Sequence, residues 1–215
     1  MRERIVLVVG DKFEDFSVGR DVMTLSQLKG LLALPHNYFP GAGRLVVMPG
    51  QGLNESDIAS VREKAARSDL AATLDLSMWY LEPRRASQKF SHKHRPENTL
   101  ISEPWRINED TYGMQILIDE NCEMMSDHQT GLHVQGMVLF EAARQSFLAV
   151  TEAYFLPQDG AKFYFVINEM SVNYSRFAFP LDARIRYVIR EKNTRKVNRQ
   201  HFVADIFIEQ CGVDV

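Results

Sequence analysis

The sequence predicts an α+β protein with two parts, a small Rossmann-like α/β unit followed by a long helix wrapped by an antiparallel sheet. In the first 76 residues, short continuous apolar runs alternate with amphipathic helical patterns. Beyond residue 97, one long helical segment is apolar on nearly every side, and the runs around it alternate apolar with polar residues. The domains are therefore expected at 1–83 and 97–215, joined by a basic linker at 84–96.

The first unit is predicted from runs that suit strands buried on both faces and from helices with one apolar face. Strands are expected at Ile5–Val9, Arg44–Met48 and Ala71–Leu76, and helices at Asp21–Leu34 and Glu55–Ala66. Asn54 or Ser56 is the expected cap of the second helix. The order β-α-β-α-β favours a small parallel sheet.

The second unit is predicted from one helix, Val134–Phe155, and from alternating runs that suit an antiparallel sheet with one wet face. Strands are expected at Asn98–Ile107, Thr111–Asp119, Lys162–Phe177, Asp182–Glu191 and Lys196–Gln210. The third of these changes phase near Asn168, which suggests a bulge. A sheet around a single buried helix is the arrangement of the hotdog fold. Its open edge favours a homodimer.

Composition excludes several classes of protein. The chain has 215 residues, a net charge of −3, 45% hydrophobic and 25% charged residues, which is typical of a globular protein rather than a disordered chain or a general nucleic-acid binder. No apolar run approaches the roughly 20 residues of a membrane span, and the start suits a strand better than a signal peptide. Cys122 and Cys211 form no metal-spaced pair, so we expect a cytoplasmic protein without a metal or cofactor.

Charge is segregated along the chain. Residues 84–95 carry five basic and no acidic side chains, whereas 96–160 carry two basic and 11 acidic ones. We expect the first group to attract an acidic carrier protein or a phosphate through Arg84, Arg85, Lys93 and Arg95. A second basic group within 184–199 has the same potential, or it is a solvated sheet face.

The densest group of reactive residues surrounds the start of the long helix. His128 and His133 lie in the preceding loop, and Glu141, Arg144 and Gln145 follow at i, i+3 and i+4 on the helix. A carboxylate on an apolar helix needs a partner or a function. Burial would raise the pKa of Glu141 and make it a general acid or base, with a histidine as its complement. The alternatives are a structural Glu141–Arg144 ion pair and a His133 that only satisfies loop carbonyls.

The same residues resemble the A-factor biosynthesis hotdog family. Its members carry an Asp-His pair, a His-Val-Pro-Gly-Met segment and a helix with Glu-Ala-(Ala/Leu)-Arg-Gln, similar to Asp127-His128, His133–Met137 and Glu141–Gln145. Residues 92–102 are similar to a further family segment, and the resemblance covers roughly 90–210. Gln135 stands where the family usually has proline. Many members hold two hotdog units, whereas this chain has room for one, which again implies a homodimer.

The resemblance implies transfer of a β-ketoacyl group from acyl carrier protein or CoA to a small hydroxylated acceptor, as in butyrolactone signal synthesis. Glu141 and His128 would be catalytic, and His133, Gly136, Arg144 and Gln145 would bind substrate, with the helix-start amides near Gly136 polarising the thioester carbonyl. A hydroxyacyl-thioester dehydratase or thioesterase is the alternative within the fold. A non-catalytic acyl- or signal-binding regulator is the alternative outside enzymes.

Overall fold

The computed structural model describes residues 4–35, 43–81, 83–127, 131–157, 163–196 and 199–215. The chain forms two compact units. The first contains residues 1–82, 118–134 and 179–181, and the second contains 83–117, 135–178 and 182–215. Among the described residues, every helix is too short or too polar to cross a bilayer.

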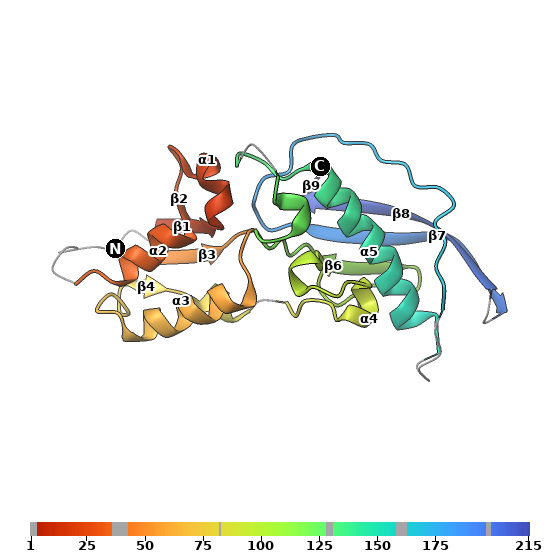
Figure 1. The fold of residues 1–215 in the computed structure, drawn as a ribbon, viewed down its shortest axis with the longest axis horizontal. Helices are drawn as coiled ribbons and strands as arrows, with labels where there is room; N and C mark the ends of the chain where they lie inside the picture. Colours follow the sequence, from red (N-terminus) through yellow and green to blue (C-terminus); the bar gives the residue numbers. More distant parts are fainter. Residues whose placement is uncertain (1–3, 36–42, 82, 128–130, 158–162, 197–198) are drawn as a thin grey trace. The chain divides into compact units, whose positions relative to one another are not determined.

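The first unit is built on a parallel sheet in the order β2-β1-β3-β4 (Figure 1). Its strands are β1 (Arg4–Val9), β2 (Val22–Thr24), β3 (Leu45–Pro49) and β4 (Leu74–Asp75), and its helices are α1 (Glu14–Ser17), α2 (Leu25–Leu32) and α3 (Glu55–Arg67). The core takes side chains from the central strands, both longer helices and the short helical turn at Ser77–Tyr80, among them the fully buried Val8, Leu28, Val47, Val61 and Trp79. Apolar burial of this kind stabilises the unit by roughly 25 cal/mol for each Å² removed from water.

Local signals explain most helix boundaries in this unit. Asn54 is confirmed as the cap of α3, because its side-chain oxygen accepts a hydrogen bond from the amide of Asp57 at 2.8 Å. The prediction that a helix begins at Asp21 is wrong by four residues. Thr24 and Gln27 form a capping box that starts α2 at Leu25, and the residues before it pair with β1 as a strand.

The second unit contains an antiparallel sheet in the order β5-β6-β7-β8-β9 and the long helix α5 (Gly136–Tyr154). The strands are β5 (Trp105–Arg106), β6 (Thr111–Gln115), β7 (Arg184–Lys196), β8 (Arg199–Gln210) and β9 (Val213–Asp214), and a short helix, α4 (Gln88–Ser91), precedes them. Figure 1 shows α5 lying across β6, β7 and β8. The expected long helix and antiparallel sheet are thus confirmed, and buried residues occur on most sides of α5.

Two predicted strands of this unit are wrong in whole or in part. The described residues of the run predicted at 162–177 have no strand, although they alternate as expected. A strand needs a neighbouring backbone to pair with, and no described strand pairs with this run. Every residue from 163 to 177 is also at least partly exposed. In the run predicted at 98–107, only Trp105–Arg106 form a strand. Pro104 just before them has no amide hydrogen to donate.

Residues 84–96, predicted as a linker, belong to the second unit. Arg85 donates hydrogen bonds to the carbonyl oxygens of Thr99 and of Leu117, the latter at 2.7 Å. Ala86 donates its backbone amide hydrogen to Ile101 at 2.9 Å and is itself buried. This segment therefore bonds to the backbone on both sides of β5 and β6, at Thr99, Ile101 and Leu117.

Candidate functional site

Glu141 lies on α5 at the centre of a charged network within the second unit. Arg144 donates two hydrogen bonds to its carboxylate, both at 2.7 Å, and Lys93 Nζ lies 2.8 Å from Oε1. Gln145 Nε2 donates a further bond to Oε1 at 3.0 Å. The Glu141 side chain is only 14% exposed, so burial of its charge is offset by two cations and one amide.

The expectation that burial raises the pKa of Glu141 is wrong. Burial alone has that effect, but the hydrogen bonds from Arg144, Lys93 and Gln145 outweigh it and lower the pKa of Glu141 to about 2. The same pairing raises the pKa of Arg144. At neutral pH Glu141 is therefore an anion, and it carries no proton to donate.

Gln145 ties α5 to the segment that enters the sheet. Its Oε1 accepts from the amide of Leu100 at 2.9 Å, and its Nε2 donates to the carbonyl oxygen of Asn98 at 2.9 Å. The residue is fully buried. An amide side chain can pair with one backbone donor and one backbone acceptor at once. Gln145 therefore gives hydrogen-bond partners to two main-chain groups of a segment that forms no continuous strand.

A second polar pair, not predicted from the sequence, lies on the same face of α5. His92 Nε2 is 3.2 Å from Glu152 Oε1, and Glu152 is buried. His92 ends α4 in a left-handed conformation with φ of 54°, and its ring packs edge-on against Phe165. One signal for this pair was available: Glu152 follows Glu141 by 11 residues, which is three helical turns and hence the same face.

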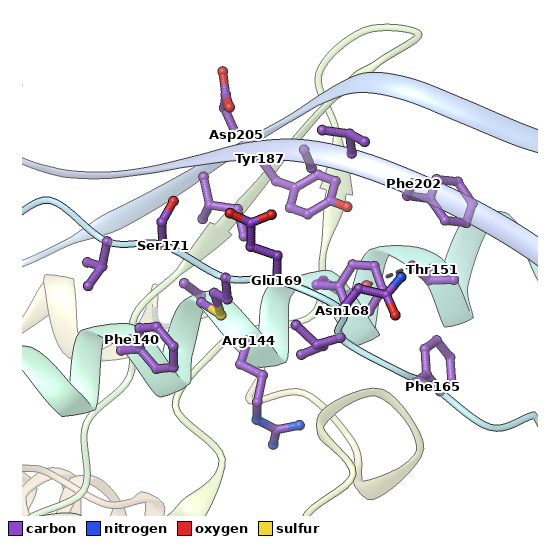
Figure 2. Close-up of a pocket in the computed structure, with 18 of the residues that line it drawn as sticks. Phe140, Arg144, Thr151, Phe165, Asn168, Glu169, Ser171, Tyr187, Phe202 and Asp205 are labelled. Atoms are coloured by element: carbon purple, nitrogen blue, oxygen red, sulfur yellow. Dashed lines mark hydrogen bonds between the residues drawn. The ribbon is translucent and has the colours of Figure 1, made fainter.

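A cavity of about 1730 Å³ lies beside a neighbouring face of α5. Figure 2 shows Phe140, Arg144 and Thr151 on the helix, Asn168, Glu169 and Ser171 on the coil, and Tyr187, Phe202 and Asp205 on the strands. Phe163, Phe165 and Phe147 add further aromatic surface. Polar and charged side chains, among them Arg195, Lys196 and Arg199, line it as well. A wall of both kinds suits an organic ligand that has an apolar part and polar groups.

The structure brings together some of the predicted site residues. Arg144 borders both the charged network and the cavity, whereas Glu141 and Gln145 are absent from the described lining and point to the 92–100 segment. Gly136 begins α5, and its carbonyl oxygen accepts a hydrogen bond at 2.8 Å from the hydroxyl of Tyr174, which lines the cavity. The side chain of the cap residue, Gln135, accepts no hydrogen bond from the first amides of α5, although its backbone carbonyl oxygen accepts one from Val138 at 3.0 Å.

The two loop histidines are located differently. His128 lies outside the described residues. His133 is half-buried and belongs to the first compact unit, while Glu141 belongs to the second. In the described parts of the chain, His, Cys, Asp and Glu side chains form no group of three that suits a metal ion.

The predicted basic surface is partly used inside the fold. Lys93 pairs with Glu141, and Arg85 binds two carbonyl oxygens, so neither presents an open charge. Arg84 is 83% exposed and 3.8 Å from Glu103, and Arg95 is also exposed. On β7, Arg186 and Arg190 pair with Glu209 and Asp205 of β8 at 2.7 Å. Of the two interpretations of the second basic group, these pairs favour a solvated sheet face.

Comparison with known proteins places most of the chain in one family. Searches of curated proteins and of solved structures gave no significant match. The family model described as the A-factor biosynthesis hotdog domain matches residues 81–214. This range includes the long helix, the antiparallel sheet, the Glu141 network and the cavity. The chain therefore belongs to the A-factor biosynthesis hotdog family.

Proposed function

We propose that this protein transfers a β-ketoacyl group from the thioester of acyl carrier protein or CoA to a small hydroxylated acceptor, in the synthesis of a butyrolactone-type signal. The observation that carries the proposal is the cavity beside α5, within the family domain. Its wall combines several phenylalanines with Arg144 and other polar side chains, which suits an acyl chain that ends in a polar carbonyl group.

In the proposed reaction, the acceptor hydroxyl oxygen attacks the thioester carbonyl carbon. A C–O bond forms, the C–S bond breaks, the hydroxyl proton passes to a base, and the thiolate leaves and takes up a proton. Negative charge develops on the carbonyl oxygen. Arg144 and the first amides of α5 near Gly136 are the proposed groups that stabilise this charge.

Removal of the hydroxyl proton needs a base with a free lone pair, and we propose His128 for that role, as predicted from the sequence. Glu141 is an anion whose lone pairs are engaged by Lys93, Arg144 and Gln145. We therefore give Glu141 the role of holding the Arg144 guanidinium in one orientation. Among the predicted binding residues, Gln145 would act through the backbone that it supports, and the substrate-binding role of His133 stays a prediction.

We further propose that the working form is a homodimer. The 163–177 segment carries large apolar side chains in water, with Tyr164 97%, Val166 75% and Phe177 69% exposed. Monomeric proteins rarely leave such a row uncovered. A second copy would cover it and would supply the second hotdog unit. Light scattering coupled to size-exclusion chromatography tests this directly, and a monomer at micromolar concentration would contradict it.

We propose that the acidic carrier docks at the exposed Arg84 and Arg95. The doubly substituted Arg84→Gln, Arg95→Gln variant should show a several-fold higher KM for acyl carrier protein and a weaker dependence of KM on salt. Its kcat should not change, because neither residue belongs to the Glu141 network. Arg67→Gln, which removes an exposed arginine from α3, is the matched control.

The deciding experiment incubates the protein with β-ketoacyl, β-hydroxyacyl and simple acyl thioesters and with dihydroxyacetone phosphate, and follows the product masses. Formation of the β-ketoacyl ester supports the proposal. Loss of water or release of a free acid would instead identify a dehydratase or a thioesterase. Arg144→Gln should lower kcat about 10²-fold, as for loss of one oxyanion donor.

A non-catalytic acyl-binding protein is the second candidate, and one observation favours it. The helix carboxylate is an ion locked by three partners, so it offers no ready proton chemistry. Saturable binding of acyl thioesters without any product, in the presence of every acceptor tested, would support this candidate over the enzyme.

A further inference from the structure

The hydroxyl of Tyr187 is a buried polar group that the fold leaves unsatisfied. Tyr187 lies on β7, and its side chain is fully buried. Its oxygen has no hydrogen-bond partner among the described residues. An unpaired buried hydroxyl costs about 1–3 kcal/mol, so native proteins seldom retain one without a use.

Tyr187 lies beside the cavity next to α5. Tyr187 belongs to the residues that line the cavity, and Figure 2 shows its ring extending from β7 along the cavity wall. Phe147, Phe202 and Ile206 also line the cavity, and Ile206 lies directly across from Tyr187 in the sheet. A ligand in this cavity would therefore lie against Tyr187 and these apolar side chains.

The neighbouring tyrosine makes the contrast clear. Tyr112 on β6 lies directly across from Tyr187 in the sheet and is equally buried. Its hydroxyl donates to the carbonyl oxygen of Glu109 at 3.4 Å, and it is not among the cavity-lining residues. The same residue type is thus satisfied where it faces the protein and unsatisfied where it borders the cavity.

We propose that the Tyr187 hydroxyl donates a hydrogen bond to the 3-oxo oxygen of the bound acyl chain and thereby selects β-ketoacyl over unsubstituted acyl groups. This inference rests on the proposed function and adds a residue that distinguishes one acyl group from another. The hydroxyl suits a donor role because burial and the nearby Tyr112 raise the pKa of Tyr187 and keep it protonated. A 3-oxo group would give the hydroxyl the partner that it lacks in the free protein, whereas a plain acyl chain would leave it unpaired.

The test compares two pantetheine compounds of equal chain length, one 3-oxoacyl and one acyl, each with an amide in place of the thioester so that no turnover occurs. Calorimetry gives the Kd of each for the full-length protein. The wild-type protein should bind the 3-oxo compound about tenfold more tightly, as expected for one buried hydrogen bond. Tyr187→Phe should abolish this preference and leave the affinity for the plain acyl compound unchanged or slightly improved.

Tyr112→Phe is the matched control, because it removes a buried hydroxyl from the adjacent strand and should retain the tenfold preference. Folding is checked by thermal melting, where Tyr187→Phe should melt no lower than the wild type, since the lost hydroxyl has no partner. Equal wild-type affinities for the two compounds would overturn this inference while leaving the acyl-binding proposal in place. Failure of both compounds to bind the wild-type protein would overturn the proposed function as well.

Discussion

Lys93 Nζ lies 2.8 Å from Glu141 Oε1, and this contact joins the segment after α4 to the middle of α5. Gln145, on the same face of α5, forms hydrogen bonds with the backbone of Asn98 and Leu100. Two turns further along the helix, Glu152 lies within hydrogen-bond distance of His92. One face of α5 thus holds the 92–100 segment through polar side chains, while a neighbouring face borders the cavity. Arg144 takes part in both.

Glu141→Gln should destabilise the protein and remove part of its acid sensitivity. The pKa of Glu141 is depressed to about 2, so its contribution is complete above the unfolded value near 4.5 and is lost as pH falls toward 2. We expect a loss of about 2–3 kcal/mol at pH 7 and a smaller difference at pH 3. Urea unfolding at both pH values measures this.

Glu63→Gln is the control for that experiment, because Glu63 pairs with Arg67 on the exposed surface of α3. Its loss should change the free energy of unfolding by less than about 0.5 kcal/mol. An equal effect of the two substitutions at pH 7 would show that the Glu141 network contributes no more than a surface ion pair.

Gln145→Leu should be destabilising although the side chain is fully buried and leucine is apolar. The change leaves the amide of Leu100 and the carbonyl of Asn98 without their side-chain partner, at about 1–3 kcal/mol for each buried group. Thermal unfolding measures the effect. Gln88→Ala, which removes an exposed bond to the His94 carbonyl, is the control and should be nearly neutral. Unchanged stability of Gln145→Leu would mean that water replaces the amide.

Gly10→Ala should destabilise the first unit. A Cβ at this position would lie 2.3 Å from the backbone oxygen of Gly52 and 2.7 Å from Glu120 Oε2, and the backbone cannot rotate away. We expect a cost of about 2–3 kcal/mol. Gly30→Ala within α2 is the opposite control, since nothing lies within 4 Å of its added Cβ and alanine favours helices. A melting temperature unchanged by Gly10→Ala would contradict the packing described.

Glu120→Gln should make the protein more stable than the wild type, and the difference should grow as pH rises. Burial, together with the carboxylates of Asp11 and Asp57, raises the pKa of Glu120, so the folded state holds a proton that the unfolded chain has released. The free energy of unfolding therefore falls as the pH rises from the pKa of Glu120 in the unfolded chain through its higher pKa in the folded protein. The glutamine oxygen can still accept from the Lys12 amide, as Oε2 does at 3.1 Å. Chemical unfolding from pH 4 to pH 8 should show a flatter profile for the variant, and a steeper one would refute the assignment.

Local patterns were sufficient wherever neighbouring residues decide the structure. The sequence alone determined that α5 is a long helix buried on most sides, since its apolar periodicity depends only on its own residues. Likewise, the Asn54 cap depends only on the three residues that follow it. The alternation of apolar and polar residues along β7 and β8 indicates a sheet with one face turned to the core. The family, too, followed from short motifs around Glu141 and Lys93.

Tertiary structure decided whatever depends on partners that are distant in sequence. The 163–177 segment alternates like a strand but pairs with none in the described chain, because a ladder requires a second backbone. The pKa of Glu141 was expected to rise from burial and instead falls, because Lys93 approaches from another element and Arg144 turns toward it. The free hydroxyl of Tyr187 has no sequence signal at all. A hydrogen bond that is not made becomes visible only once every surrounding group has been placed.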